Sequence, residues 1–263
     1  MAVFVAAVGV LTVVPLQHEK PTARQIREKL LLELRPVVLE NCTLERIGST
    51  NDGGYLMCAN LLGRIQSAYS YGIGPADDWG CAISERHGVP VHQYDCFNPP
   101  QVECVGGQPV FHNECIGAVR EVIESRVFDT LTHQIFRNGD TRKTLVVKID
   151  VEGAELESLL ATPARVLDRM DQLAMEIHGA DERFLTLVQK LKRTFYLVHL
   201  HYNNQACSQR YRPLPAWAYQ VLFVNKRIGV PDPARPTPRL PHPLDAPDYS
   251  LGRDCQIPEA PRH

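Results

Sequence analysis

The stretch LVVKIDVEGAELESLL, residues 145–160, decides the fold class of this chain. Its first five residues are apolar except for Lys148, as expected of a strand that is buried on both faces of a parallel sheet. From residue 154 onward the apolar residues return at helical spacing. Asp150, Glu152 and Glu155 lie at the join. The turn therefore predicts a strand followed by a helix, with three carboxylates where the strand ends.

The chain between residues 67 and 225 repeats this alternation of strand and helix. The alternation predicts an α/β fold with a mainly parallel sheet, because a strand followed by a helix returns to the sheet by a right-handed crossover. The turn NDGG at 51–54 lies between two short strand-like runs and predicts a hairpin. The expected strands are 68–73, 89–95, 109–117, 145–150, 172–178, 195–202 and 218–225. The expected helices are 22–34, 76–87, 119–136, 154–160 and 181–194.

Composition is that of an ordinary globular protein, with 44% hydrophobic and 22% charged residues among 263. The formal net charge is -2 and no basic stripe with interleaved aromatic residues is present, so nucleic acid is not an expected partner. We divide the chain into a signal peptide or clipped membrane anchor at 1–20, a folded domain at 21–227 and an extended tail at 228–263. The tail contains nine prolines and little hydrophobic periodicity.

An apolar run covers residues 2–14 and is interrupted by Thr12 alone. The run is too short for a helix that crosses a bilayer, which needs about 20 residues, but it suits the hydrophobic region of a secretory signal. The alternative is a buried strand or helix of the domain. We expect the secretory pathway as the location (secreted, or in the Golgi or ER lumen), and otherwise the cytoplasm. Membrane contact is expected only through this run, if it is not cleaved.

The eight cysteines contain no CxxC pair, which argues against a zinc ribbon or a thioredoxin-type site. An even count beside a secretory signal indicates some disulfides in an oxidising compartment. The alternative is that several cysteines are small buried hydrophobic residues, an interpretation that suits Cys58, Cys96 and Cys115 in or beside predicted strands. The pairing does not follow from the sequence.

The first expected strand runs into Tyr71-Gly72-Ile73-Gly74, a turn that lets the backbone approach a ligand closely. Asp77 stands where a dinucleotide-binding fingerprint has its third glycine, and its carboxylate would repel a pyrophosphate. The pattern therefore disfavours NAD or FAD and favours a cationic cofactor or an amine. Asp95 ends the second strand about twenty residues later, the spacing of an acid that accepts ribose hydroxyls. The alternative for Asp95 is a turn or helix cap.

Acidic and imidazole side chains end the fourth and fifth expected strands. Asp150 ends the fourth, and Glu176 and His178 share one side of the fifth because side chains alternate along a strand. Such a set can hold a divalent ion or act in acid–base catalysis. We take Asp150 and His178 as candidate catalytic residues, and Asp150, Glu176 and His178 as candidate metal ligands. Glu155 is better explained by the favourable charge at a helix N-terminus, and His199 by a structural role.

Two pairs of segments resemble known methyltransferases. VVKIDVEGAELESLL at 146–160 and LAMEIHG at 173–179 are similar to the FkbM-type methyltransferases. NDGGYLMC at 51–58 and SYGIGPADDW at 70–79 resemble a related group of animal methyltransferase-like proteins, which are often secretory. The similarity covers roughly residues 46–227, and neither the apolar N-terminal run nor the tail belongs to it.

The resemblance implies a class I methyltransferase fold, which is Rossmann-like, with a seven-stranded, mostly parallel sheet, helices on both faces and an antiparallel last strand. It also implies S-adenosyl-methionine as the cofactor, with a divalent cation as a second candidate. The segment 115–117 would border the adenine, and an acidic residue near the glycine turn suits the sulfonium and amine. The candidate cofactor-binding residues are Tyr71, Gly72, Gly74, Asp77, Asp95, Cys96 and Ile116.

The implied activity is an S-adenosyl-methionine-dependent methyltransferase, by default an O-methyltransferase that acts on a sugar or another small hydroxyl compound. Two alternatives remain at this stage. One is a nicotinamide-dependent oxidoreductase on a similar sheet, which the missing third glycine disfavours. The other is a secreted module that keeps the fold without catalysis, which the carboxylates at several strand ends disfavour.

Overall fold

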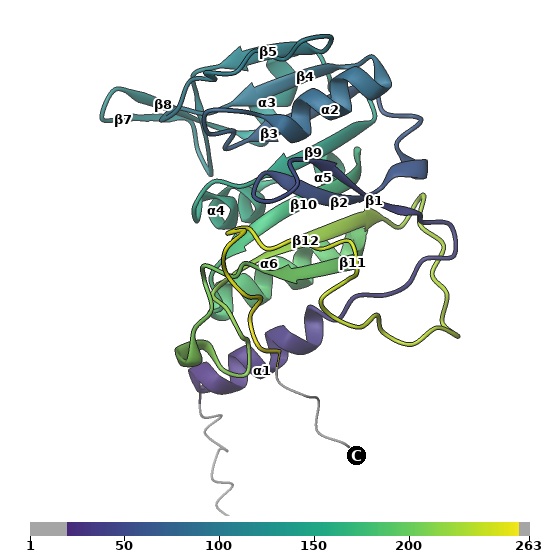
Figure 1. Ribbon diagram of the computed structural model, residues 1–263. Helices are drawn as coiled ribbons and strands as arrows, with labels where there is room; N and C mark the ends of the chain where they lie inside the picture. The colour runs from purple at the N-terminus through teal and green to yellow at the C-terminus, as the bar shows by residue number, and fades with distance from the viewer. Residues whose placement is uncertain (1–19, 258–263) are drawn as a thin grey trace, which may run out of the picture.

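The computed structural model describes residues 20–257 (Figure 1). The apolar run at 2–14, on which the signal or anchor prediction depends, lies outside them. Within the described part of the chain, no helix is long and apolar enough to cross a membrane.

A seven-stranded sheet forms the centre of the molecule, in the order β11-β12-β10-β9-β3-β4-β5. The neighbours from β10 to β5 are parallel, whereas β12 is antiparallel to both β10 and β11. The α/β prediction with a mostly parallel seven-stranded sheet is therefore confirmed. The bounds are β3 (Ser67–Tyr71), β4 (Pro90–Tyr94), β5 (Gln108–His112), β9 (Leu145–Ile149), β10 (Met170–His178), β11 (Phe195–Tyr202) and β12 (Ala218–Asn225).

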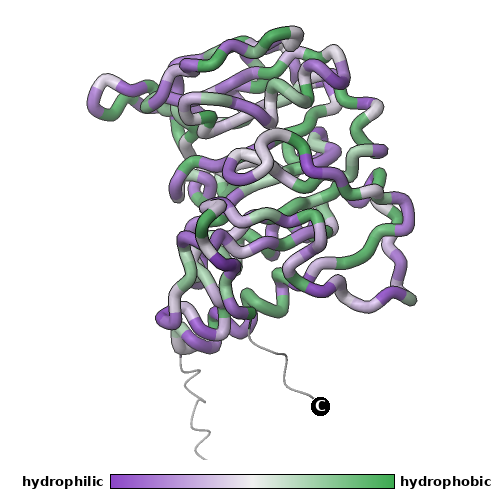
Figure 2. Tube along the Cα trace, in the orientation of Figure 1, coloured by the Kyte–Doolittle hydropathy of each residue, from purple (hydrophilic) through white to green (hydrophobic). Residues whose placement is uncertain are grey.

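Side chains of the central strands point alternately into two separate buried clusters. In β9, Val147 packs into one cluster and Val146 into the other, so the two clusters lie on opposite faces of the sheet. All five residues of β9 are buried, as its apolar sequence predicts. Figure 2 shows hydrophobic stretches along the strands at the centre and hydrophilic stretches in the loops around them.

The two faces are covered differently. One face packs against α1 (Ala23–Glu33), α3 (Leu131–Arg137), α4 (Ala154–Ala161), α5 (Ala164–Leu167) and α6 (Glu182–Thr194). The other face packs against α2 (Asp78–His87) and the predicted hairpin, which consists of β1 (Leu44–Gly48) and β2 (Gly54–Cys58). Two short 3₁₀ helices complete the elements: η1 (Ala59–Leu61) follows β2, and η2 (Gln209–Tyr211) precedes β12. Helices thus lie on both faces, but a hairpin takes much of the space on the second (Figure 1). Its tip reaches the carboxyl ends of the parallel strands.

The segment 109–136 differs from its prediction as one long strand and one long helix. It contains a second, three-stranded sheet of β6 (Cys115–Gly117), β7 (Glu121–Ile123) and β8 (Arg126–Thr130), followed by the short helix α3. Glu124 and Ser125 adopt positive φ angles of 48° and 65°, which makes a tight hairpin turn between β7 and β8. The prediction was wrong because neither residue is a usual turn signal at such φ angles, where glycine and asparagine are favoured.

Residues 228–257 of the tail contain no helix and no named strand, yet they pack on the outer strands of the sheet. Asp245 Oδ1 lies 2.8 Å from His199 Nε2 of β11. Asp248 Oδ1 accepts a hydrogen bond of 2.8 Å from Gln220 Nε2 of β12. The tail thus covers a part of the sheet that α2 and the hairpin leave open.

All eight cysteines are paired in disulfides, so none is an isolated buried hydrophobic residue. The bonds join residues that are 16 to 48 positions apart in the sequence. The pairs are Cys42–Cys58, Cys81–Cys104, Cys96–Cys115 and Cys207–Cys255. The last pair fastens the tail to the loop after β11.

Candidate functional site

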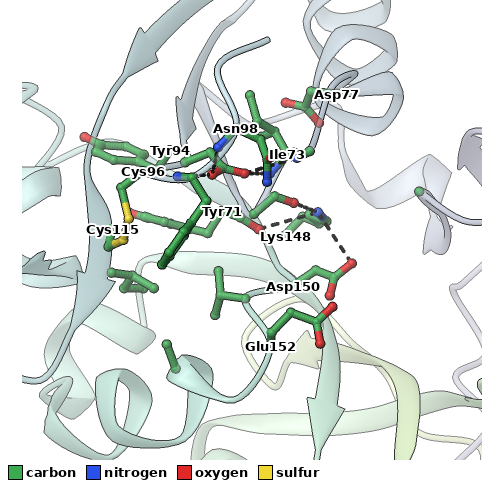
Figure 3. A pocket seen from close by; sticks show the side chains of 18 of the residues that line it. Tyr71, Ile73, Asp77, Tyr94, Cys96, Asn98, Cys115, Lys148, Asp150 and Glu152 are labelled. Atoms are coloured by element: carbon green, nitrogen blue, oxygen red, sulfur yellow. Dashed lines mark hydrogen bonds and ion pairs between the residues drawn. A yellow bond between two sulfur atoms is a disulfide. The ribbon is translucent and has the colours of Figure 1, made fainter. Parts of the chain in front are cut away.

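A cavity of about 650 Å³ opens at the carboxyl ends of β3, β4 and β9 (Figure 3). Its volume lies in the range of small-molecule binding sites. Asp150 lines it, whereas Glu176 and His178 lie outside its lining. The structure brings together in this one cavity all the candidate cofactor-binding residues, namely Tyr71, Gly72, Gly74, Asp77, Asp95, Cys96 and Ile116.

The glycine turn after β3 is packed directly on the end of β9. Gly72 has a φ of +71°, and a Cβ atom there would lie 1.6 Å from the backbone oxygen of Asp150. The Gly72 N–H donates to the Tyr94 carbonyl at 2.9 Å, which joins the turn to β4 as well. Gly74, with a φ of +57°, has open space where a side chain would be. Gly72 is therefore needed for strand packing, and Gly74 keeps the cavity open.

Asp95 braces the glycine turn from the end of β4. Its Oδ1 accepts short hydrogen bonds from the N–H groups of Phe97 (2.8 Å) and Asn98 (2.7 Å). Its Oδ2 accepts longer ones, both 3.2 Å, from Ile73 and Gly74. Both oxygens thus hold backbone, and Oδ2 is the one whose weaker contacts leave it able to accept from a ligand hydroxyl. The turn-bracing role that was the alternative for Asp95 is therefore observed, and a ligand role stays a prediction.

Asp77 reaches the cavity wall, but its carboxylate is committed to the protein. Oδ1 accepts from Ser70 Oγ and from the Gly80 N–H, both at 2.9 Å, and Oδ2 accepts from Gln93 Nε2 at 3.0 Å. Asp77 is the N-cap of α2, a position that favours aspartate. Its three hydrogen bonds assign it to holding α2 against β3 and β4 rather than to contacting an amine. Asp78, the next residue, is exposed and also lines the cavity.

The opposite wall is apolar and comes from the small second sheet. Ile116 of β6 and Phe128 of β8 line the cavity, and the disulfide between Cys96 and Cys115 ties β6 to the end of β4. Figure 3 shows this disulfide beside Tyr94, across the cavity from the acidic residues. Phe97 at the rim is 64% exposed. Because the second sheet was not predicted, Phe128 could not be placed at the site from sequence.

Lys148, Asp150 and Tyr55 form a connected polar group on the acidic side of the cavity. Figure 3 shows Lys148 beside Asp150. Lys148 Nζ donates to the Gly72 carbonyl at 2.5 Å and lies 3.8 Å from Asp150 Oδ2. Tyr55, from β2, donates to the same Asp150 oxygen at 2.9 Å. Burial, followed by the charges of Asp150 and Glu176, raises the pKa of the Tyr55 phenol far above its usual value. Tyr55 therefore stays protonated and remains a donor.

His178 lies next to this group and is oriented by a carboxylate. Its Nδ1 is 3.3 Å from Glu155 Oε1, which also accepts the His178 backbone N–H at 2.9 Å. Burial lowers the pKa of His178, but the hydrogen bond to Glu155 and the charges of Glu176 and Asp150 outweigh it and raise the pKa to about 9. The neighbouring carboxylates thus favour the charged form of the His178 imidazole. Asp150 and His178 both stay candidate catalytic residues.

Glu176 completes the acidic cluster behind Asp150. Its Oε1 accepts a hydrogen bond of 2.7 Å from Asn203 Nδ2, and its Oε2 lies 3.8 Å from His178 Nε2. Burial and the Asp150 charge raise the pKa of Glu176. The predicted set Asp150, Glu176 and His178 is thus brought together, with one ligand atom of each within 4.8 Å of the others. His199 lies apart from it and pairs with the tail.

Several residues of the site were not predicted. Asp52 and Gly53 at the hairpin tip line the cavity mouth, and Tyr55 and Lys148 hold Asp150. A lysine within an otherwise apolar buried strand is the signal that could have identified Lys148, because a buried ammonium needs a partner. The chain matches no known protein-family model and no curated protein.

Proposed function

We propose that this protein is an S-adenosyl-methionine-dependent methyltransferase that acts on a hydroxyl group of a small molecule or sugar. One observation carries the proposal. The glycine turn, the acid after β4 and the acid after β9 line a single cavity at the carboxyl edge of a mostly parallel sheet. In open α/β sheets, ligands bind at this edge. The antiparallel last strand, β12, supports the finer assignment to the class I methyltransferases and to an FkbM-type relationship.

The residues present fit the parts of this cofactor. Asp95 Oδ2, whose contacts with the glycine turn are long, can accept ribose hydroxyls there. Ile116 and Phe128 offer an apolar wall that suits a flat base. The exposed carboxylates of Asp52 and Asp78 at the cavity lining suit a positively charged group. A pyrophosphate would meet the same carboxylates, which disfavours a nicotinamide dinucleotide.

S-adenosyl-methionine, when bound, supplies a methyl group on a positively charged sulfur that an oxygen nucleophile can displace in line. Asp150 Oδ1 accepts no hydrogen bond from the described residues, whereas Oδ2 is held by Tyr55. Oδ1 is therefore the Asp150 atom that would take the proton of an acceptor hydroxyl. Lys148, beside the glycine turn, keeps that carboxylate in place. Positioning supplies most of the acceleration in such a displacement.

Isothermal calorimetry of the full chain with S-adenosyl-methionine is the direct test. We expect one binding site per chain and a weaker one in Phe97→Ala, because Phe97 lines the cavity and is exposed. Phe136→Ala is the matched control, since Phe136 is 66% exposed on α3 and does not line the cavity. Binding of NADH in place of S-adenosyl-methionine would overturn the proposal.

Turnover is tested separately from binding. Extracts incubated with the protein and methyl-labelled S-adenosyl-methionine should yield a labelled product and S-adenosyl-homocysteine in mass spectrometry. Asp150→Asn should still bind the cofactor but lose at least a hundredfold in rate, since general-base catalysis contributes about 10²–10⁴-fold. Binding without any turnover in varied extracts would favour a non-catalytic module.

We also propose that the protein works in the secretory pathway. The support is the pairing of all eight cysteines, since disulfides persist in oxidising compartments and are rare in the cytosol. Expression of the tagged full chain in cells, followed by non-reducing peptide mapping of medium and lysate, tests this. Fully reduced protein in the cytosol would contradict it.

A further inference from the structure

Three ligand atoms from two neighbouring strand ends converge beside the cavity. His178 Nε2 lies 3.8 Å from Asp150 Oδ1 and 3.8 Å from Glu176 Oε2. Glu152 Oε2 is a fourth oxygen, 3.5 Å from the same nitrogen. Asp150 and Glu152 also line the cavity, so the cluster borders the cavity through these two residues, while Glu176 and His178 lie behind them.

Among the described residues, these three atoms lie at ion-pair distance from one another, and His178 Nε2 also lies near Glu152, but none of the three is hydrogen-bonded. Neither Asp150 Oδ1 nor Glu176 Oε2 accepts a hydrogen bond, and His178 Nε2 makes none. The His178 and Glu176 side chains are only 6% and 5% exposed. An imidazole nitrogen that faces carboxylate oxygens from two neighbouring strand ends, with one ligand atom of each residue within 4.8 Å of the others, is an arrangement that suits a divalent cation.

The remaining atoms of the cluster are occupied in the way that a metal site needs. His178 Nδ1 is paired with Glu155, so the ring orientation is fixed and Nε2 is the atom turned toward the carboxylates. Glu155 is held in turn, because its Oε2 accepts from the Gly153 N–H at 2.7 Å. A carboxylate behind a ligating histidine is the usual orienting partner in metal sites. Asp150 and Glu176 are likewise fixed through their other oxygens, by Tyr55 and Asn203.

We propose that Asp150, Glu176 and His178 bind a first-row divalent cation such as Mn²⁺ or Zn²⁺, with Glu155 as a positioning residue. Mixed oxygen and imidazole ligands favour such ions over Mg²⁺ and Ca²⁺, which prefer oxygen alone. Binding of the ion does not depend on the proposed methyl transfer. Its role in that reaction does: the ion would lower the pKa of an acceptor hydroxyl that reaches it from the cavity, in place of direct proton transfer to Asp150.

The test uses the full chain, dialysed against a chelator and titrated with MnCl₂. Loss of the free Mn²⁺ signal in electron paramagnetic resonance should show one bound ion per chain. We expect at least tenfold weaker binding in His178→Ala and Glu176→Gln. His133→Ala is the matched control, because His133 pairs with one carboxylate, Asp129, at 2.6 Å and no second one converges there. A hundredfold excess of Mg²⁺ should be needed to displace Mn²⁺.

A second measurement does not depend on whether the variants fold. Pulsed paramagnetic resonance of Mn²⁺ on the wild-type protein should show coupling to an imidazole nitrogen. Absence of that coupling, absence of a bound ion, or unchanged affinity in a folded His178→Ala variant would each overturn the proposal. The Mn²⁺ titration contains no S-adenosyl-methionine, so the two proposals fail separately. Bound Mn²⁺ without binding of S-adenosyl-methionine would support the metal site and overturn the methyltransferase proposal. Binding of S-adenosyl-methionine without bound Mn²⁺ would overturn the metal site alone.

Discussion

Replacing Asp248 by Asn removes a buried, titratable carboxyl group that the tail brings to the sheet. Asp248 is 6% exposed; its Oδ1 accepts from Gln220, and its Oδ2 has no partner among the described residues. Burial, followed by the charge of Asp52, raises the pKa of Asp248 to about 7, although Arg46 acts in the opposite direction. The carboxyl is therefore protonated in the folded chain over a range where the unfolded chain has already ionised.

This difference makes stability depend on pH with a known sign. Well below the unfolded value of 3.8 the group is protonated in both states, so it adds no pH dependence to the free energy of unfolding there. Between the unfolded value of 3.8 and the folded value of about 7, the folded chain holds more protons, so the free energy of unfolding falls as pH rises. A tenfold change in proton affinity is worth about 1.4 kcal/mol, which gives a total near 4 kcal/mol. Because the tail can shift to admit water, we expect roughly half, about 1–2 kcal/mol, between pH 5 and 8.

Urea unfolding followed by circular dichroism at pH 5 and pH 8 measures the effect. Asp248→Asn should reduce the loss of stability between these two pH values by about 1–2 kcal/mol. Asp254→Asn is the matched control in the same tail, since that side chain is 37% exposed. An equal pH dependence in wild type and Asp248→Asn would refute both the buried position of the carboxyl and the packing of the tail on β12.

Three further substitutions test how the site is held. Gly72→Ala should lower the free energy of unfolding, measured in urea, by more than 2 kcal/mol, because a left-handed φ costs about 1–2 kcal/mol and the new Cβ would collide with the Asp150 carbonyl. The variant should also lose cofactor binding in calorimetry. A stable variant that binds the cofactor would contradict this. Lys148→Met should lower the free energy of unfolding by about 2–4 kcal/mol in the same assay, since the Gly72 carbonyl and the Asp150 carboxylate lose the Lys148 ammonium group. An unchanged urea midpoint would show that Lys148 is dispensable. Replacing both Cys207 and Cys255 by Ser removes the disulfide that closes a loop with a sequence separation of 48. The free energy of unfolding should fall by about 4 kcal/mol, from the loss of chain entropy that the bond imposes on the unfolded state. A thermal midpoint that does not fall would show that the tail needs no covalent link.

Local patterns of hydrophobicity predicted most of the central sheet. The strands at 195–202 and 218–225 agree with β11 and β12 at both ends, and α6 begins one residue after its expected start. Buried residues recur every two positions along a half-buried strand and every three or four along a helix, so residues close together in the sequence suffice to predict the element. The strands of the segment 109–136 were not predicted, because the turn at Glu124 depends on backbone angles that glutamate rarely adopts.

The sequence by itself determined which carboxylates and glycines meet at one edge, because the carboxyl ends of parallel strands must lie together. It placed Asp95 and Asp150 beside the glycine turn without any knowledge of their partners. Tertiary structure alone decided what these side chains do there: that Tyr55 holds Asp150, that Lys148 binds the Gly72 carbonyl, and how the cysteines pair. These roles depend on contacts between residues far apart in the chain, such as the 95 positions that separate Tyr55 from Asp150. Side-chain periodicity carries no record of such distant partners.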